Sequence, residues 1–115
     1  MKDINGEIEY KGKTYKLVFN LNVMEKIQDE FETIDKWASL TSGKEQEVNV
    51  KALKYGFTEM LNEALEIEAE ENGTEFIPIT EKQVGRMLTE LGMEKMTEAL
   101  QTTVVESTKS DEKNV

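Results

Sequence analysis

The chain has 115 residues, of which 37% are hydrophobic and 33% charged, and its formal net charge is −10. This size fits a single domain with one modest core, and the apolar content is too high for a wholly disordered chain. The absence of cysteine and histidine excludes disulfides, Cys/His zinc sites, and thiolate or imidazole catalysis, so we expect neither an enzyme nor a cofactor.

Residues 4–19 are predicted to form a β-hairpin. Apolar and charged side chains alternate along both arms of this segment, as they do in half-buried strands. Gly12, which lies between two lysines, supplies the positive φ that a tight hairpin turn requires. An isolated hairpin is marginal in water, so we expect it to pack on helices or to join the sheet of another chain through its edge.

The hairpin is followed by segments that predict about four helices. In each segment apolar residues recur every three to four positions, which places them on one helical face. Thr33 is a potential interruption of the first segment, which would leave a helix and a short turn. The polar residues 39–49 lack periodicity and predict a loop. The predicted helices cover about residues 22–38, 50–72, 81–91 and 93–106.

Several local signals mark the ends of these helices. Gly73 is suited to end the second helix, and Thr80 with Gln83 forms a capping box that starts the third. Pro78 favours an extended conformation for the connector 75–79. The large apolar residues of this connector are expected to reach the core: Phe76, Ile77 and Ile79.

The final residues, 107–115 (STKSDEKNV), have the polar composition of a disordered tail. The expected architecture is therefore α+β, mainly α: an N-terminal hairpin followed by about four helices around one small core. We place this single domain at residues 1–106.

The charge is concentrated in one segment. Residues 55–81 contain eight acidic residues and no basic residue. Such a surface disfavours nucleic acid and anionic membranes and suits a basic protein partner. Solvated helix faces that keep the chain soluble are the alternative. The helical spacing of these glutamates could also recruit a divalent cation, but no EF-hand spacing is present and we expect no metal. Three glutamates are our candidates for partner binding: Glu63, Glu66 and Glu70.

Apolar partner-binding candidates come from the single tryptophan and the last helix. Trp37 is the type of residue that anchors interfaces, and the methionines Met93 and Met96 suit an adaptable binding surface. Leu100 extends the same face of the last helix. For each of these residues, packing in the core is the alternative.

No run reaches the roughly 18 apolar residues that span a bilayer. The first ten residues, MKDINGEIEY, lack the apolar region of a signal peptide. We therefore expect a cytoplasmic protein.

Two stretches resemble a known family. Residues 4–6 (ING), 10–19 (YKGKTYKLVF) and 20–27 (NLNVMEKI) look like the start of many phage tail assembly chaperones, where a hairpin leads into the first helix. Residues 79–85 (ITEKQVG) are similar to the start of a C-terminal helix in the same family, including relatives from gene transfer agents.

The resemblance implies a phage or prophage protein that binds the tape measure protein and helps to recruit tail tube subunits. It would act in the cytoplasm of the bacterial host and be missing from the mature virion. Self-association stays open. The alternatives are a small structural virion protein, such as a head–tail connector or tail component, and an acidic DNA-mimic inhibitor.

Overall fold

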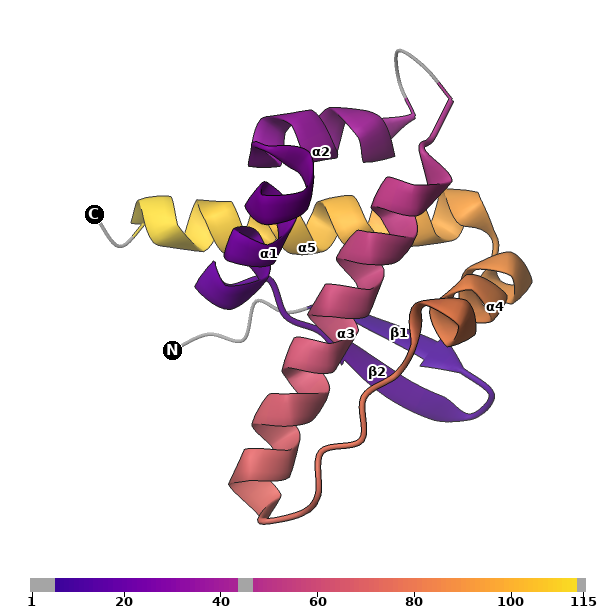
Figure 1. Ribbon diagram of the computed structural model, residues 1–115, viewed down its shortest axis with the longest axis vertical. Helices are drawn as coiled ribbons and strands as arrows, with labels where there is room; N and C mark the ends of the chain where they lie inside the picture. Colours follow the sequence, from indigo (N-terminus) through magenta and orange to yellow (C-terminus); the bar gives the residue numbers. More distant parts are fainter. Residues whose placement is uncertain (1–5, 44–46, 114–115) are drawn as a thin grey trace.

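A computed structural model describes residues 6–43 and 47–113, with side chains described up to residue 105. Within these residues the chain is mainly helical with one two-stranded antiparallel sheet, which confirms the predicted α+β, mainly α class. Figure 1 shows α3 crossing the middle of the molecule and α5 lying behind it. The elements are β1 (Gly6–Tyr10), β2 (Lys13–Leu17), α1 (Leu21–Phe31), α2 (Ile34–Ser42), α3 (Val50–Asn72), α4 (Glu81–Leu91) and α5 (Met93–Lys113).

The predicted hairpin is confirmed. β1 and β2 pair antiparallel with Ile8 opposite Tyr15, and only two residues connect them. These are Lys11 and Gly12, at φ 51° and 77°, the two positive angles of a type I′ turn. The strands are shorter than the predicted segment, since Leu17 ends β2; residues 4 and 5 lie outside the described residues.

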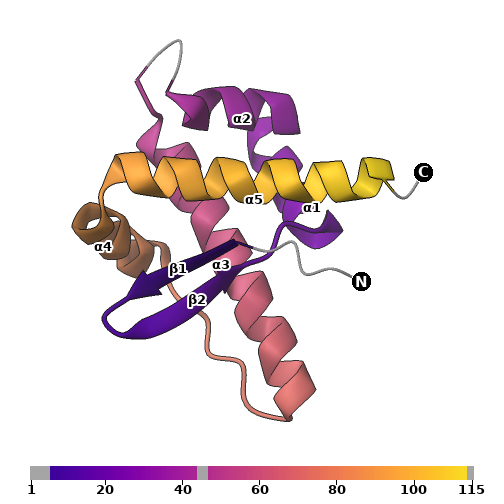
Figure 2. The same cartoon turned by 180° about the vertical axis from the view of Figure 1, so that it is seen from behind.

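The two faces of the hairpin differ in polarity. Ile8 and Leu17 lie on one face and are 8% and 0% exposed. Glu7 and Lys16 lie opposite each other on the other face, and both are exposed. β2 packs against α3 and β1 against α5. The hairpin is therefore held between the two long helices, as Figure 2 shows from behind.

The predicted helix 22–38 is in fact two helices. Glu32 has a φ of 78°, which no α-helix tolerates, and the Thr33 hydroxyl accepts a hydrogen bond from the backbone N–H of Lys36. This cap starts α2, which continues to Ser42 and ends at Gly43 in the left-handed conformation. The start of the predicted loop 39–49 is thus helical, because four residues without Gly or Pro extend an already capped helix.

The predicted helix 50–72 is confirmed as α3, with Gly73 as its left-handed C-cap at φ 67°. The Asn49 side chain accepts from the N–H of Ala52 and caps the N-terminus. Burial is concentrated in the first half of the helix. Its fully or nearly fully buried large residues are Leu53, Phe57, Met60 and Leu61.

The connector before α4 is held by its backbone. Asn62 on α3 accepts from the N–H of Ile79 at 2.8 Å and donates to its carbonyl oxygen at 3.0 Å. This pair of hydrogen bonds holds the main chain of the connector in place, so not every apolar side chain of the connector has to be buried. The prediction that Ile77 reaches the core is wrong: it is 71% exposed, whereas Phe76 is half-buried and Ile79 packs against the core.

The predicted capping box of α4 is confirmed, with the Thr80 hydroxyl and the Gln83 side chain each accepting from the other's backbone N–H. α4 ends at Leu91, as predicted. The last helix was expected to end near residue 106 and residues 107–115 to be disordered, but α5 continues to Lys113. This tail prediction is wrong for residues 107–113 because polar composition without Gly or Pro does not stop a helix; residues 114–115 lie outside the described residues.

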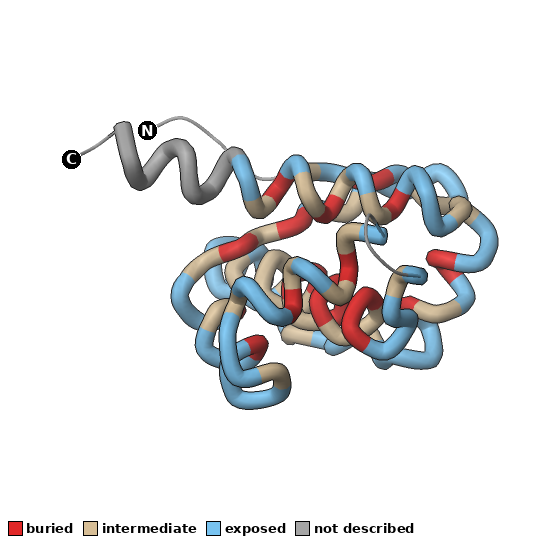
Figure 3. The backbone as a smooth tube through the Cα atoms, turned by 90° about the horizontal axis from the view of Figure 1, so that it is seen from above, coloured by how far each residue is buried: buried red, intermediate tan, exposed pale blue. Residues whose placement is uncertain are grey.

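The buried apolar side chains form one cluster to which both strands and all five helices of the described residues contribute. Its largest members include Trp37, Phe57 and Ile27, each 0% exposed. In Figure 3 the buried positions lie on the inner sides of the elements and the exposed positions on their outer sides. The extent of the domain, residues 1–106, stays a prediction.

Candidate protein-binding surfaces

Trp37 belongs to the core and not to an accessible surface. It is 0% exposed and stacks on Phe19 with ring centroids 6.2 Å apart. Its indole N–H donates to the carbonyl oxygen of Ala52 at 3.0 Å. The prediction that Trp37 contacts a partner is therefore wrong for this folded state, since every part of the side chain is already covered.

The three candidates on α5 differ in how far they are exposed. Met96 and Leu100 are each 1% exposed, because they lie on the side of α5 that packs against the rest of the molecule. Their assignment to a binding surface is wrong for the same reason as that of Trp37. Met93, at the first position of α5, is 40% exposed and stays available.

The three candidate glutamates on α3 also differ. Glu63 Oε2 accepts from the side-chain amides of Asn20 at 2.8 Å and Asn22 at 3.1 Å, and so ties α3 to the start of α1. Glu66 and Glu70 are exposed. Within the described part of the chain, no three carboxylates come together as a set that could hold a metal ion.

Burial, assisted by nearby carboxylates, shifts the pKa values of two residues on α3. Burial raises the pKa of Glu59; the Lys26 ammonium opposes this shift, while the carboxylates of Glu81 and Glu63 add to it. Burial raises the pKa of Tyr55 to about 12, and the carboxylates of Glu59, Glu30, Asp29 and Glu81 add to the shift. The ionised form of Glu59 is therefore disfavoured in the folded state.

We expect Glu59→Gln to stabilise the protein at neutral pH. The folded pKa of Glu59 lies above its ordinary value of 4.5, so the folded state binds the proton more tightly than the unfolded state does. At a pH above the folded pKa the carboxylate is ionised in both states, and its burial then lowers the free energy of unfolding. The urea midpoint should rise at pH 7, and the gain should vanish as the pH falls through the folded pKa to below 4.5. Glu68→Gln, at an exposed position, is the control; a lower midpoint for Glu59→Gln at pH 7 would contradict the account.

A shallow apolar groove of about 400 Å³ lies between the first half of α3, α4 and the start of α5. We call it the α3–α4 groove. Val50 and Met93 are 53% and 40% exposed on it, and Gly85 leaves room beside the Lys54 side chain, whose Cε would lie 3.4 Å from an added Cβ. The lining residues are Val50, Leu53, Lys54, Gly85, Leu88, Thr89 and Met93.

Basic residues gather along one side of this groove. A second depression of about 730 Å³ shares Val50, Lys54, Gly85 and Thr89 with it and reaches the hairpin turn. None of its cations forms a salt bridge with another described residue. We call these four residues the basic rim: Lys11, Lys54, Lys82 and Arg86.

The basic rim was not foreseen from the sequence. Its members come from the hairpin turn, α3 and α4, which are far apart in the sequence. No local motif joins them. Only the packing of α4 and the hairpin beside α3 brings them together.

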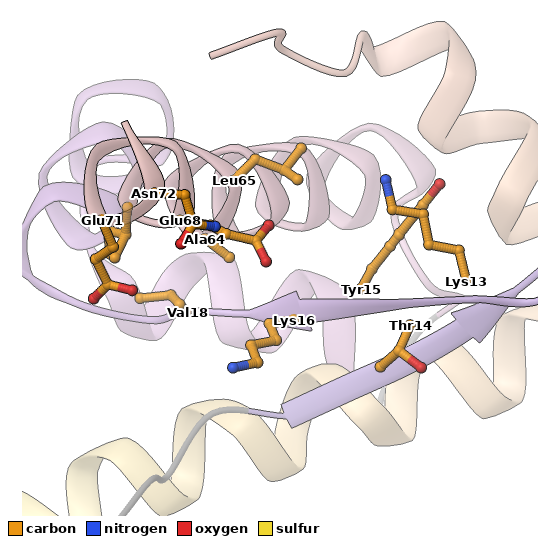
Figure 4. A pocket seen from close by; sticks show the side chains of 11 residues that line it. Lys13, Thr14, Tyr15, Lys16, Val18, Ala64, Leu65, Glu68, Glu71 and Asn72 are labelled. Atoms are coloured by element: carbon orange, nitrogen blue, oxygen red, sulfur yellow. The ribbon is translucent and has the colours of Figure 1, made fainter. Parts of the chain in front are cut away.

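A third surface lies along the free side of β2. We call it the β2 groove; it has a volume of about 400 Å³ and runs between β2 and the second half of α3. Figure 4 shows Lys13 and Tyr15 pointing to the side of α3, with Ala64 on the side of the helix toward β2; Leu65 also lines the groove. The groove combines an apolar wall with charged groups of both signs, Lys13 and Lys16 on the strand and Glu68 and Glu71 on the helix.

The backbone of β2 faces this groove unpaired. A two-residue turn makes Tyr10 and Lys13 a hydrogen-bonded pair, and such pairs alternate along an antiparallel ladder. The N–H and C=O groups of Thr14 and Lys16 therefore point away from β1. The backbone N–H of Val18 points in the same direction and donates to the carbonyl oxygen of Met60 on α3 at 3.3 Å. Within the described residues, α3 closes the edge at Val18 only and leaves it open at Thr14 and Lys16.

Comparisons with models of protein families, with curated proteins and with solved structures gave no match. Among the residues that the structure describes, no helix is both long enough and apolar enough to cross a membrane.

Proposed function

We propose that this chain is a phage or prophage tail assembly chaperone that binds the tape measure protein and helps to recruit tail tube subunits. The observation that carries the proposal is the open edge of β2 beside the apolar wall of α3. The resemblance of residues 4–27 and 79–85 to that family supports it and supplies the identity of the client.

The β2 groove suits an extended client segment. Such a segment would pair with Thr14 and Lys16 as a third strand, and its alternate side chains would lie on Ala64 and Leu65. The open edge spans few residues, and each new hydrogen bond contributes about 0.5–1.5 kcal/mol net. Binding of this kind is weak at any one site and reversible, which suits a factor that leaves the finished tail.

Co-expression with the product of the neighbouring long tail gene tests the proposal. We expect the chain to co-purify with that product and to elute with it as a complex in size-exclusion chromatography. Failure to form a complex, with both proteins folded, would count against the chaperone function.

Mass spectrometry of purified particles distinguishes the main alternative. A chaperone acts in the host cytoplasm and should be missing from mature virions. A small connector or tail component would be present in stoichiometric amounts. Detection at such levels would replace the chaperone proposal with the structural one.

A further inference from the structure

The two ends of α3 carry surfaces of opposite character. Lys54 lies near its N-terminal end beside the α3–α4 groove, and Glu70 lies 16 residues later, about 24 Å away along the helix axis. Beyond Glu70 the chain turns into the connector that carries the exposed Ile77. Figure 1 shows this end of α3 extending away from the hairpin and α4, and the connector running from it back to α4.

We call the second surface the acidic knob. Its members are all exposed, and Ile77, at 71%, is one of the most exposed large apolar residues in the described chain. Neither of the two described salt bridges involves its carboxylates. The knob consists of Glu70, Glu71, Glu75 and Ile77.

The knob and the groove complement each other in both charge and polarity. The knob presents the exposed side chain of Ile77 and three exposed carboxylates from the end of α3 and the connector. The groove presents exposed Val50 and Met93 beside the four cations of the basic rim, which outnumber the single carboxylate of Glu90 in the same depression. Placing Ile77 against Met93 would remove both from water, and the carboxylates of the knob would meet ammonium and guanidinium groups.

We propose that the α3–α4 groove of one copy binds the acidic knob of a second copy. Lys54 and Glu70 lie about 24 Å apart along one rigid helix, so the carboxylates at the C-terminal end of α3 do not reach the groove of their own copy. The contact joins two different surfaces, so it is heterologous and leaves a free knob and a free groove at the ends. Copies therefore add head to tail.

Charge decides the conditions under which this contact forms. The net charge of −10 on each copy opposes association, but charges separated by more than about 8 Å are largely screened at physiological salt. The close contacts between knob and rim then dominate. Because those contacts are themselves electrostatic in part, association should weaken again at high salt.

Two variants separate the two halves of the contact. The groove variant carries Lys82→Glu and Arg86→Glu; the knob variant carries Glu71→Gln, Glu75→Gln and Ile77→Ser. All five positions are exposed, so both variants should keep the helical far-UV circular dichroism of the wild type. A control with Lys16→Glu and Lys95→Glu reverses two charges outside the contact.

Sedimentation velocity over a concentration series, at about 0.15 M and 1 M salt, measures association. We expect the wild type and the control to exceed the monomer mass of 13.2 kDa at the lower salt and to approach it at the higher. Each variant alone should stay monomeric. An equimolar mixture of the two variants should form a dimer and nothing larger, because only one intact groove and one intact knob can meet.

A monomeric wild type over the whole series would overturn the proposal. So would variants that associate as the wild type does, or a mixture that stays monomeric. Association lost only in the Lys16/Lys95 control would place the contact at β2 or α5 and would also overturn the proposal. The inference goes beyond the proposed function and does not depend on it, since the client is absent from the experiment.

Discussion

Replacing Trp37 by alanine is expected to lower the free energy of unfolding by about 3–5 kcal/mol, the range for deleting a large buried aromatic side chain. Trp37 is 0% exposed, so its whole contact surface is lost. The variant also loses the ring stack on Phe19 and the hydrogen bond to Ala52. Since a domain of this size is stable by only about 5–15 kcal/mol, Trp37→Ala should approach the limit of folding.

Gly56 lies against the Trp37 ring, so a second substitution there tests the position of the indole. A Cβ at Gly56 would overlap Cζ2 of Trp37 and lie 3.0 Å from its Cε2. We expect Gly56→Ala to destabilise the wild type by about 1–3 kcal/mol through overpacking. In the Trp37→Ala background the clash is gone, and the same change should stabilise α3 by up to about 1 kcal/mol because alanine is the better helix former.

Urea denaturation followed by circular dichroism at 222 nm measures all four proteins of this cycle, since fluorescence would be lost with the only tryptophan. The sign reversal of Gly56→Ala is the decisive result. Equal effects of Gly56→Ala in the two backgrounds would mean that the indole does not lie against Gly56.

Replacing Thr14 by proline is expected to reduce client binding by about tenfold or more. Proline removes the outward N–H at the centre of the open edge and places a ring where the added strand would lie. The β1–β2 ladder does not use this N–H, so the hairpin should survive. Loss of one hydrogen bond and a steric clash together exceed the 1.4 kcal/mol that corresponds to a factor of ten.

Thr14→Ala is the matched control because it shortens the same side chain and keeps the N–H. Titration of the client against wild type, Thr14→Ala and Thr14→Pro gives the three dissociation constants. Thr14→Ala should bind within a few-fold of the wild type. If Thr14→Pro binds as tightly while circular dichroism shows an intact fold, the client does not add to β2.

Most of the fold could be predicted because its signals are local. The turn at Gly12 needs only two neighbouring positive φ angles, and the capping box of Thr80 and Gln83 spans one helical turn. Gly73 ends α3 for the same kind of local reason. Such features depend little on what the rest of the chain does.

The wrong predictions of helix ends and burial arise where tertiary packing determines the structure or where the sequence contains no stop signal. The backbone at Glu32 takes a positive φ that its own side chain does not favour, and the break lets α2 carry Trp37 into the core. Ile77 looks like a core residue in the sequence, but the backbone pairing between Asn62 and Ile79 fixes the connector without it. Residues 107–113 continue a helix that nothing in their sequence stops.

The candidate surfaces were harder to predict than the fold. Residue type alone favoured Trp37 as an interface residue. Because Gly56 has no side chain, however, the indole packs against its backbone and is buried in the core. The α3–α4 groove was predicted only through Met93. The basic rim depends on the packing of three elements that are distant in sequence, and no single segment carries its charge.

Hydrogen–deuterium exchange of the chain with and without its client tests the central claim, that β2 is extended by a client strand. In the free protein the amides of Thr14 and Lys16 face the open edge and should exchange fast. In the complex we expect these two amides to be strongly protected, while those of Tyr15 and Leu17, already paired with β1, change little. A complex in which Thr14 and Lys16 exchange as fast as before would contradict the account.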